Sequence, residues 1–143
     1  MIIAKCSVVG ARDAPNFRQA VQCGHHEFIC DEHAALGGAD AGPSPFDYLL
    51  ASLGACTSIT LRMYAQRKGW DLGSVQVQLS MRQDEAKVKS IERHVTLSGA
   101  LTDEQRQRLA EICEKTPVTL AVRSGVSVRT TLGPEGSAPP TPQ

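Results

Sequence analysis

The chain has 143 residues, with 15 basic and 15 acidic side chains and a formal net charge of zero. This length is that of one ordinary domain, and the balanced charge without a basic run excludes the electrostatic attraction on which binding to nucleic acid or to an anionic membrane depends. The first ten residues lack the regions of a signal peptide, and no apolar stretch approaches the roughly 18 residues of a membrane span. We therefore expect a cytoplasmic protein.

The five cysteines are an odd number at spacings that do not repeat. Without an export signal, this pattern argues against a disulfide framework and predicts reduced thiols, most of them small core residues.

The first third of the chain predicts strands over residues 2–9, 17–23 and 26–31, because apolar and β-branched residues run or alternate there. Residues 33–45 are rich in Gly and Pro and predict a loop.

A long helix is predicted after this loop. Ser44 can act as the N-cap, Pro45 fits the first helical position, and Asp47 completes a capping box. The helix can run to Lys68, with Gly69 as its stop signal.

This helix carries few polar side chains between residues 46 and 63, so it must be buried on nearly all sides. One small subunit has difficulty covering it, and we therefore expect a homodimer. Small residues at helical spacing would let a partner helix approach closely; they are Ala51, Gly54, Ala55 and Ser58.

In the second half, residues 74–82 and 91–98 alternate as two strands of a hairpin. Thr102 and Gln105 form a second capping box that opens a helix, and Pro117 ends or kinks it. A short helix over residues 118–123 and a last strand over 125–132 are expected next. The element order predicts an α+β fold in a single domain, residues 1–132, followed by a disordered tail, residues 133–143.

Cys56 lies in the middle of the predicted long helix. By spacing alone, a cysteine among Leu, Ala and Gly is most often a packing residue. A nucleophilic role would require a thiolate, and Cys56 is about three turns from the N-cap, too deep for the helix terminus to help. A cation from elsewhere in the fold, most plausibly an arginine, would have to stabilise it.

The run DEHAALGGADAGPSPFDYLLASLGACTSITLRMYAQRKGW resembles the central motif of the OsmC/Ohr superfamily (osmotically inducible protein C and organic hydroperoxide resistance proteins). A Gly-Gly loop there leads through Ser-Pro to a long helix that contains Gly-Ala-Cys-Thr. The resemblance covers the chain apart from its tail.

The resemblance implies antiparallel sheets around a long central helix, in an intertwined homodimer with active sites near the subunit interface. It implies that Cys56 is a peroxidatic nucleophile that reduces organic hydroperoxides, and that a second cysteine or an external thiol or dithiol resolves the sulfenic acid. No cofactor or metal is implied.

Two departures from the family pattern affect the supporting residues. Thr116 stands before Pro117, where the resolving cysteine is expected, and Cys113 lies three residues earlier as a candidate resolving residue or a core residue. Phe46 occupies the position of a helix carboxylate; the neighbouring Asp47 can only weakly replace it and is more simply a capping residue.

The activating arginine of the family corresponds to Arg12 or Arg18, and the sequence leaves both open. Either side chain could also be a solvated surface charge.

Three alternatives accompany the peroxidase interpretation. Cys23, His25, His26, Cys30 and His33 could form a metal cluster, although their spacing fits no known zinc pattern. The chain could instead be a non-catalytic dimer that binds a small apolar ligand, with Cys56 as a lining residue. A thiol enzyme acting on another electrophile is the third alternative.

Overall fold

The computed structural model describes residues 1–134 and 136–138, and the fold is α+β. The N-terminal strands are β1 (Cys6–Val9), β2 (Gln19–Cys23) and β3 (His26–Cys30), and a short 3₁₀ helix, η1 (Ala34–Leu36), lies in the loop that follows. Helix α1 (Pro45–Lys68) precedes the hairpin of β4 (Val75–Gln83) and β5 (Lys89–Leu97), and then α2 (Asp103–Cys113) and α3 (Pro117–Ser124) complete the chain of elements.

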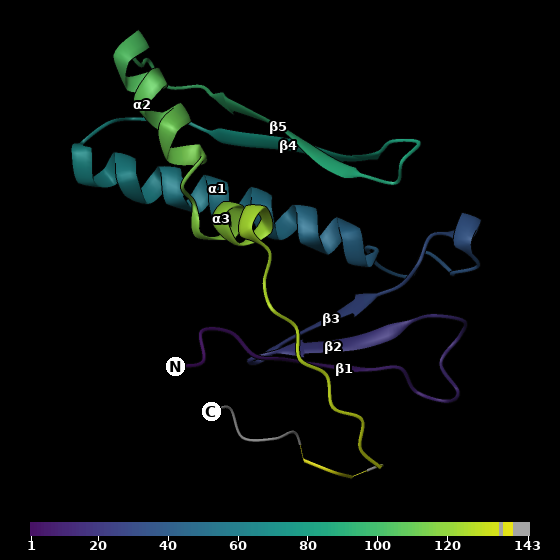
Figure 1. The fold of residues 1–143 in the computed structure, drawn as a ribbon. Helices are drawn as coiled ribbons and strands as arrows, with labels where there is room; N and C mark the ends of the chain where they lie inside the picture. Colours follow the sequence, from purple (N-terminus) through teal and green to yellow (C-terminus); the bar gives the residue numbers. More distant parts are fainter. Residues whose placement is uncertain (135, 139–143) are drawn as a thin grey trace.

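Two antiparallel sheets lie on opposite sides of α1 (Figure 1). The first has the strand order β1-β2-β3, and the second is the β4–β5 hairpin, which packs on α1. Helices α2 and α3 also pack on α1. The start of α1 is tied to the first sheet, because the Tyr48 hydroxyl donates to the carbonyl of Ile29 at 2.6 Å.

The predicted bounds of α1 are confirmed. The Ser44 hydroxyl accepts from the Asp47 amide, the Asp47 carboxylate accepts from the Ser44 amide, and Gly69 ends the helix in the left-handed conformation with φ 70°. The second capping box, between Thr102 and Gln105, is also present. Pro117 begins a separate short helix, as expected.

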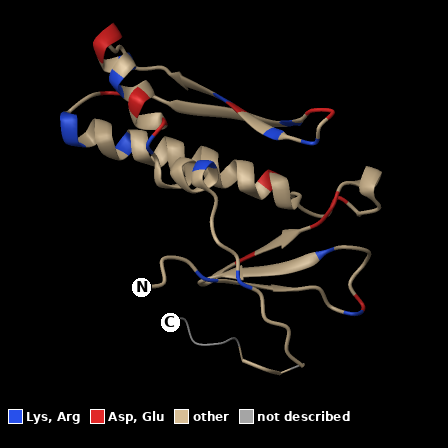
Figure 2. Cartoon of the chain, viewed as in Figure 1, with Lys and Arg blue, Asp and Glu red and all other residues tan. Residues whose placement is uncertain are grey.

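The main core forms between the C-terminal half of α1, the hairpin and α2. Its buried members are Leu61, Ala65, Leu72, Leu109 and Cys113. Along α1, burial follows one face only, while large apolar side chains on other faces stay exposed, including Ile59 at 58% and Met63 at 53%. The helix also carries few charges along its length (Figure 2).

The sequence predicted that Gly54 would let a partner helix approach closely, but Gly54 faces the hairpin instead. It is buried beneath β4, and a Cβ atom at this position would lie 2.8 Å from the Leu79 Cδ1 atom. Its missing side chain therefore lets the hairpin approach α1, whereas Ala51 and Ala55 remain exposed.

The strand predicted over residues 125–132 is wrong for this chain. Within the described residues this segment has no regular secondary structure, and Val126 and Val128 are 72% and 88% exposed. Its alternating pattern is real, but a strand exists only when a neighbouring strand pairs with it. Of the predicted tail, residues 135 and 139–143 lie outside the described residues.

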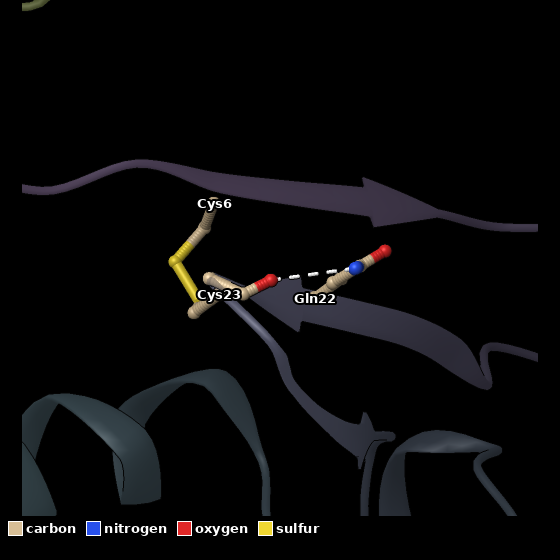
Figure 3. The surroundings of a disulfide bond; sticks show 4 residues. Cys6, Gln22 and Cys23 are labelled. Atoms are coloured by element: carbon tan, nitrogen blue, oxygen red, sulfur yellow. Dashed lines mark hydrogen bonds between the residues drawn. A yellow bond between two sulfur atoms is a disulfide. The ribbon is translucent and has the colours of Figure 1, made fainter.

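The expectation of reduced thiols is wrong for two of the five cysteines. Cys6 and Cys23 form a disulfide between β1 and β2 (Figure 3), while Cys30, Cys56 and Cys113 are free. The two bonded residues are 17 positions apart and meet because the antiparallel register places them directly opposite each other.

Candidate active site around Cys56

Cys56 is a half-buried free thiol in the middle of α1. It precedes the fully buried Thr57 and is therefore turned about 100° from it around the helix axis, at the border of the buried face. Its Sγ atom lies 3.9 Å from the Thr60 hydroxyl, one turn further along the same side. The sulfur thus sits between the packed face of α1 and the exposed apolar one.

Arg93 on β5 approaches the residue next to Cys56. Its guanidinium donates to the hydroxyls of Thr57 at 2.9 Å and Thr119 at 2.8 Å, and to the carbonyl of Cys113 at 2.9 Å. It also lies 3.8 Å from the Glu114 carboxylate, and only 12% of its side chain is exposed. This largely buried cation joins α1, β5, α3 and the end of α2.

Arg93 was not among the predicted site residues, although the sequence carries a signal for it. Ile91, Arg93, Val95 and Leu97 occupy the inward-facing positions of β5, so an arginine stands in an otherwise apolar row. Because buried charges in proteins are paired or hydrogen-bonded, such a position indicates polar partners inside the fold.

A pocket of about 490 Å³ opens between the first half of α1, the hairpin and α3. Arg93, Glu114 and Arg123 lie on one part of its wall, and the Arg123 guanidinium forms an ion pair with the Glu114 carboxylate. The apolar lining residues are Phe46, Leu49, Leu53, Met81, Ile91 and Val122. The volume falls in the range of small-molecule sites.

Cys113 ends α2 and packs in the core with Leu61 and Leu109. Burial raises the pKa of its thiol, against a smaller lowering effect from Arg93. Thr116, which stands where the resemblance places a resolving cysteine, is the N-cap of α3, and its hydroxyl lies 2.6 Å from that of Thr119. The hydroxyl at this position therefore has a structural function.

Asp47 has the capping role that the sequence favoured. Hydrogen bonds from Ser44, chiefly from its backbone amide, lower the pKa of the Asp47 carboxyl. The same carboxylate lies 3.3 Å from His33 Nε2. The neighbouring Phe46 is 52% exposed, and the ammonium of Lys89 lies 5.9 Å from its ring centroid.

Arg12 and Arg18 both lie in the exposed connection between β1 and β2. The charge of Arg18 contributes to the lowered pKa of Asp31, after the larger effect of backbone hydrogen bonds led by that of Ala41. Each arginine lies in this loop of the first sheet, and its role toward Cys56 stays a prediction.

The residues of the metal-cluster alternative have other partners. Cys23 is bonded to Cys6, and His33 faces the carboxylates of Asp40 and Asp47. Over residues 1–134 and 136–138, no group of three or more His, Cys, Asp and Glu side chains is arranged to hold a metal ion. The same part of the chain contains no helix that is both long and apolar enough to cross a membrane.

Solved structures share this fold. An OsmC-like protein from Mycoplasma pneumoniae aligns with a TM-score of 0.71 and 12% identity, covering 84% of this chain and 86% of its own. An organic hydroperoxide resistance protein OsmC from Legionella pneumophila aligns with a TM-score of 0.64 and 19% identity, covering 86% and 90%. An organic hydroperoxide resistance protein from Elizabethkingia anophelis aligns with a TM-score of 0.62 and 22% identity, covering 86% and 89%.

No curated protein matches the chain. The family model described as OsmC-like protein matches residues 37–131, which include the whole of α1, the hairpin, α2 and α3. The chain therefore belongs to the OsmC-like protein family.

Proposed function

We propose that this protein is a thiol-dependent peroxidase that reduces organic hydroperoxides to alcohols through Cys56. The observation that carries the proposal is the position of Cys56, a half-buried free thiol in the middle of the family's long helix, beside an exposed apolar face. Two of the similar structures are organic hydroperoxide resistance proteins, which supports a role in the response to peroxides.

The other two free thiols are poorer candidates. Burial, with the charges of Glu32, Asp31 and Asp47, raises the pKa of the Cys30 thiol. Burial also raises the pKa of Cys113, which has only 8% of its surface exposed. Because the thiolate is the nucleophile, both changes disfavour attack by these residues at neutral pH.

In the proposed reaction, the Cys56 thiolate attacks the distal oxygen of the hydroperoxide, and the O–O bond breaks. The sulfur becomes a sulfenic acid, and the departing alkoxide takes a proton from solvent to give the alcohol. An external thiol then condenses with the sulfenic acid, releasing water and forming a mixed disulfide, and a second thiol group displaces Cys56 in its reduced form.

An external thiol or dithiol is the resolving group in this proposal because Cys113 is held in the core. The exposed apolar side chains of Ile59 and Met63 lie on the same helix as Cys56 and would favour an alkyl substituent over hydrogen peroxide.

We further propose that the active protein is a homodimer. Ile59 and Met63 leave apolar surface exposed on α1, and the alternating segment 125–132 lacks a pairing strand within the described subunit. A second subunit would cover the exposed apolar surface of α1 and could pair with segment 125–132. It would also offer another copy of the loop with Arg12 and Arg18 as a source of the activating cation.

The test is to treat the protein, with free thiols reduced, with one equivalent of cumene hydroperoxide or of hydrogen peroxide and to map the modified cysteines. We expect rapid oxidation confined to Cys56, faster with the organic peroxide, and its loss in Cys56→Ser but not in the matched control Cys30→Ser. A Cys56–Cys113 disulfide in the product would show that Cys113 resolves the reaction after all.

The pocket supports a second candidate function, binding of a small apolar ligand without catalysis, because Cys56 is not among the residues that line it. Oxidation of Cys56 no faster than that of Cys30 or Cys113 would contradict the peroxidase proposal and favour this alternative.

A further inference from the structure

The Cys6–Cys23 disulfide lies outside the chemistry proposed for Cys56 and is accessible from solvent. Cys6 is exposed and Cys23 is half-exposed, at the end of the sheet where β2 turns into β3 (Figure 3). Their Cα atoms are 4.3 Å apart, close to the roughly 4.5 Å of a non-hydrogen-bonded cross-strand pair. The disulfide therefore joins two neighbouring strands rather than distant parts of a core.

The two sulfur atoms have different surroundings. In the register of the sheet, Cys6 is opposite Cys23, and Cys23 is opposite His26, so the three side chains form one row on the same face. Strand β1 is the edge strand of the described sheet. The Cys6 end of the row thus faces an open edge, whereas the Cys23 end faces an imidazole.

A surface hollow of about 450 Å³ lies beside Cys6. It is lined by Lys5, Cys6, Ser7, Gln22 and Gly24. The ammonium of Lys5, the residue before Cys6, makes this end of β1 attractive to an anionic molecule.

We propose that Cys6–Cys23 is a thiol-exchange site, at which an anionic low-molecular-weight thiol attacks Cys6 and displaces Cys23. A thiolate attacks along the continuation of the S–S bond, and the row of side chains ends at Cys6 on the edge strand but continues beyond Cys23 to His26. Attack at Cys6 is therefore the unobstructed direction, and His26 is placed to stabilise the departing thiolate of Cys23.

Two molecules of the external thiol supply the electrons that reduce the disulfide. The incoming thiolate forms a mixed disulfide with Cys6, the Cys6–Cys23 bond breaks, and the electron pair leaves on Cys23, which then takes a proton. A second thiol molecule releases Cys6 as a thiol and yields the oxidised form of the reductant; the reverse steps close the disulfide again. Opening removes the covalent link between β1 and β2.

The test uses the full-length protein with its disulfide closed, at neutral pH without denaturant. It is incubated with reduced glutathione, quenched with iodoacetamide and mapped by peptide mass. We expect the glutathione adduct on Cys6 and the alkyl group on Cys23 in most of the singly opened molecules. The opposite distribution, an even one, or a disulfide that stays closed until denaturant is added would overturn the proposal.

Two variants test the asymmetry. His26→Gln should slow opening, whereas His94→Gln, at an exposed position of the other sheet, should not. Equal rates for the two variants would contradict the role of His26. Cys56→Ser should open at the rate of the unmodified protein, so this result is independent of the peroxidase proposal.

Discussion

Replacing Arg93 by Met should destabilise the protein by about 2–4 kcal/mol. The change removes three hydrogen bonds from a charged donor, each of the order of 1.5–3 kcal/mol. Part of this loss is offset, because Thr57 still donates to the Leu53 carbonyl and Thr119 still bonds to Thr116, and because the variant no longer desolvates a charge. The methionine keeps most of the apolar stem.

The assay is urea unfolding followed by Trp70 fluorescence and by circular dichroism, at one fixed protein concentration so that any dimer dissociation is held constant. Arg93→Lys keeps the charge but loses the forked geometry of the guanidinium. Its free energy of unfolding should therefore lie between those of the unmodified protein and Arg93→Met. The matched control is Arg123→Met, which breaks an exposed ion pair with Glu114 and should cost less than about 1 kcal/mol.

A loss of less than about 0.5 kcal/mol for Arg93→Met, or a loss equal to that of Arg123→Met, would refute the assignment of Arg93 as a buried connecting residue. A double-mutant cycle of Arg93→Met and Thr119→Val measures the coupling energy between these two side chains. A coupling energy near zero would mean that the hydrogen bond between them contributes nothing to stability.

Two further predictions concern pH and assembly. Backbone hydrogen bonds, led by that of Ala41, lower the pKa of Asp31 below its unfolded-state value of 3.8. The contribution of Asp31 to stability is therefore complete above pH 3.8 and is lost as the pH falls through the lower pKa of the folded state. Unfolding measured between pH 5 and pH 2 should lose part of its acid dependence in Asp31→Asn, and an unchanged profile would contradict the lowered pKa. Ile59→Asp should convert the proposed dimer to a monomer in sedimentation experiments, whereas the control Glu85→Asp, in the exposed hairpin turn, should leave the dimer intact. An unmodified protein that sediments as a monomer would contradict the dimer proposal.

The sequence predicted best those features that are encoded locally. Ser44, Pro45 and Asp47 determine where α1 begins and Gly69 determines where it ends, and all these signals act within a few residues of the helix termini. The same is true of the capping box between Thr102 and Gln105.

Features that depend on pairing between distant segments were less predictable. Residues 125–132 alternate like a strand, but alternation describes the faces of a strand and does not supply the neighbour that must bond to it. The Cys6–Cys23 disulfide depends on the register between β1 and β2, which cysteine spacing does not contain.

The candidate site shows the same division. The family motif around Cys56 is contiguous and could be recognised, and the capping role of Asp47 followed from its position. The partners of Arg93 come from α1, α3 and the end of α2, so the sequence could indicate a buried arginine without identifying what it contacts.

The hydrogen bonds of Arg93 also bear on the order in which the chain folds. They join residues that are 36, 26 and 20 positions apart, and each can form only after the intervening chain has closed into a loop. Contacts of such high sequence separation slow folding, and those made after the rate-limiting step act mainly by slowing unfolding. We therefore expect this one guanidinium to make α1, β5 and α3 lose their structure together, so that the chain unfolds more cooperatively than its small apolar core alone would allow.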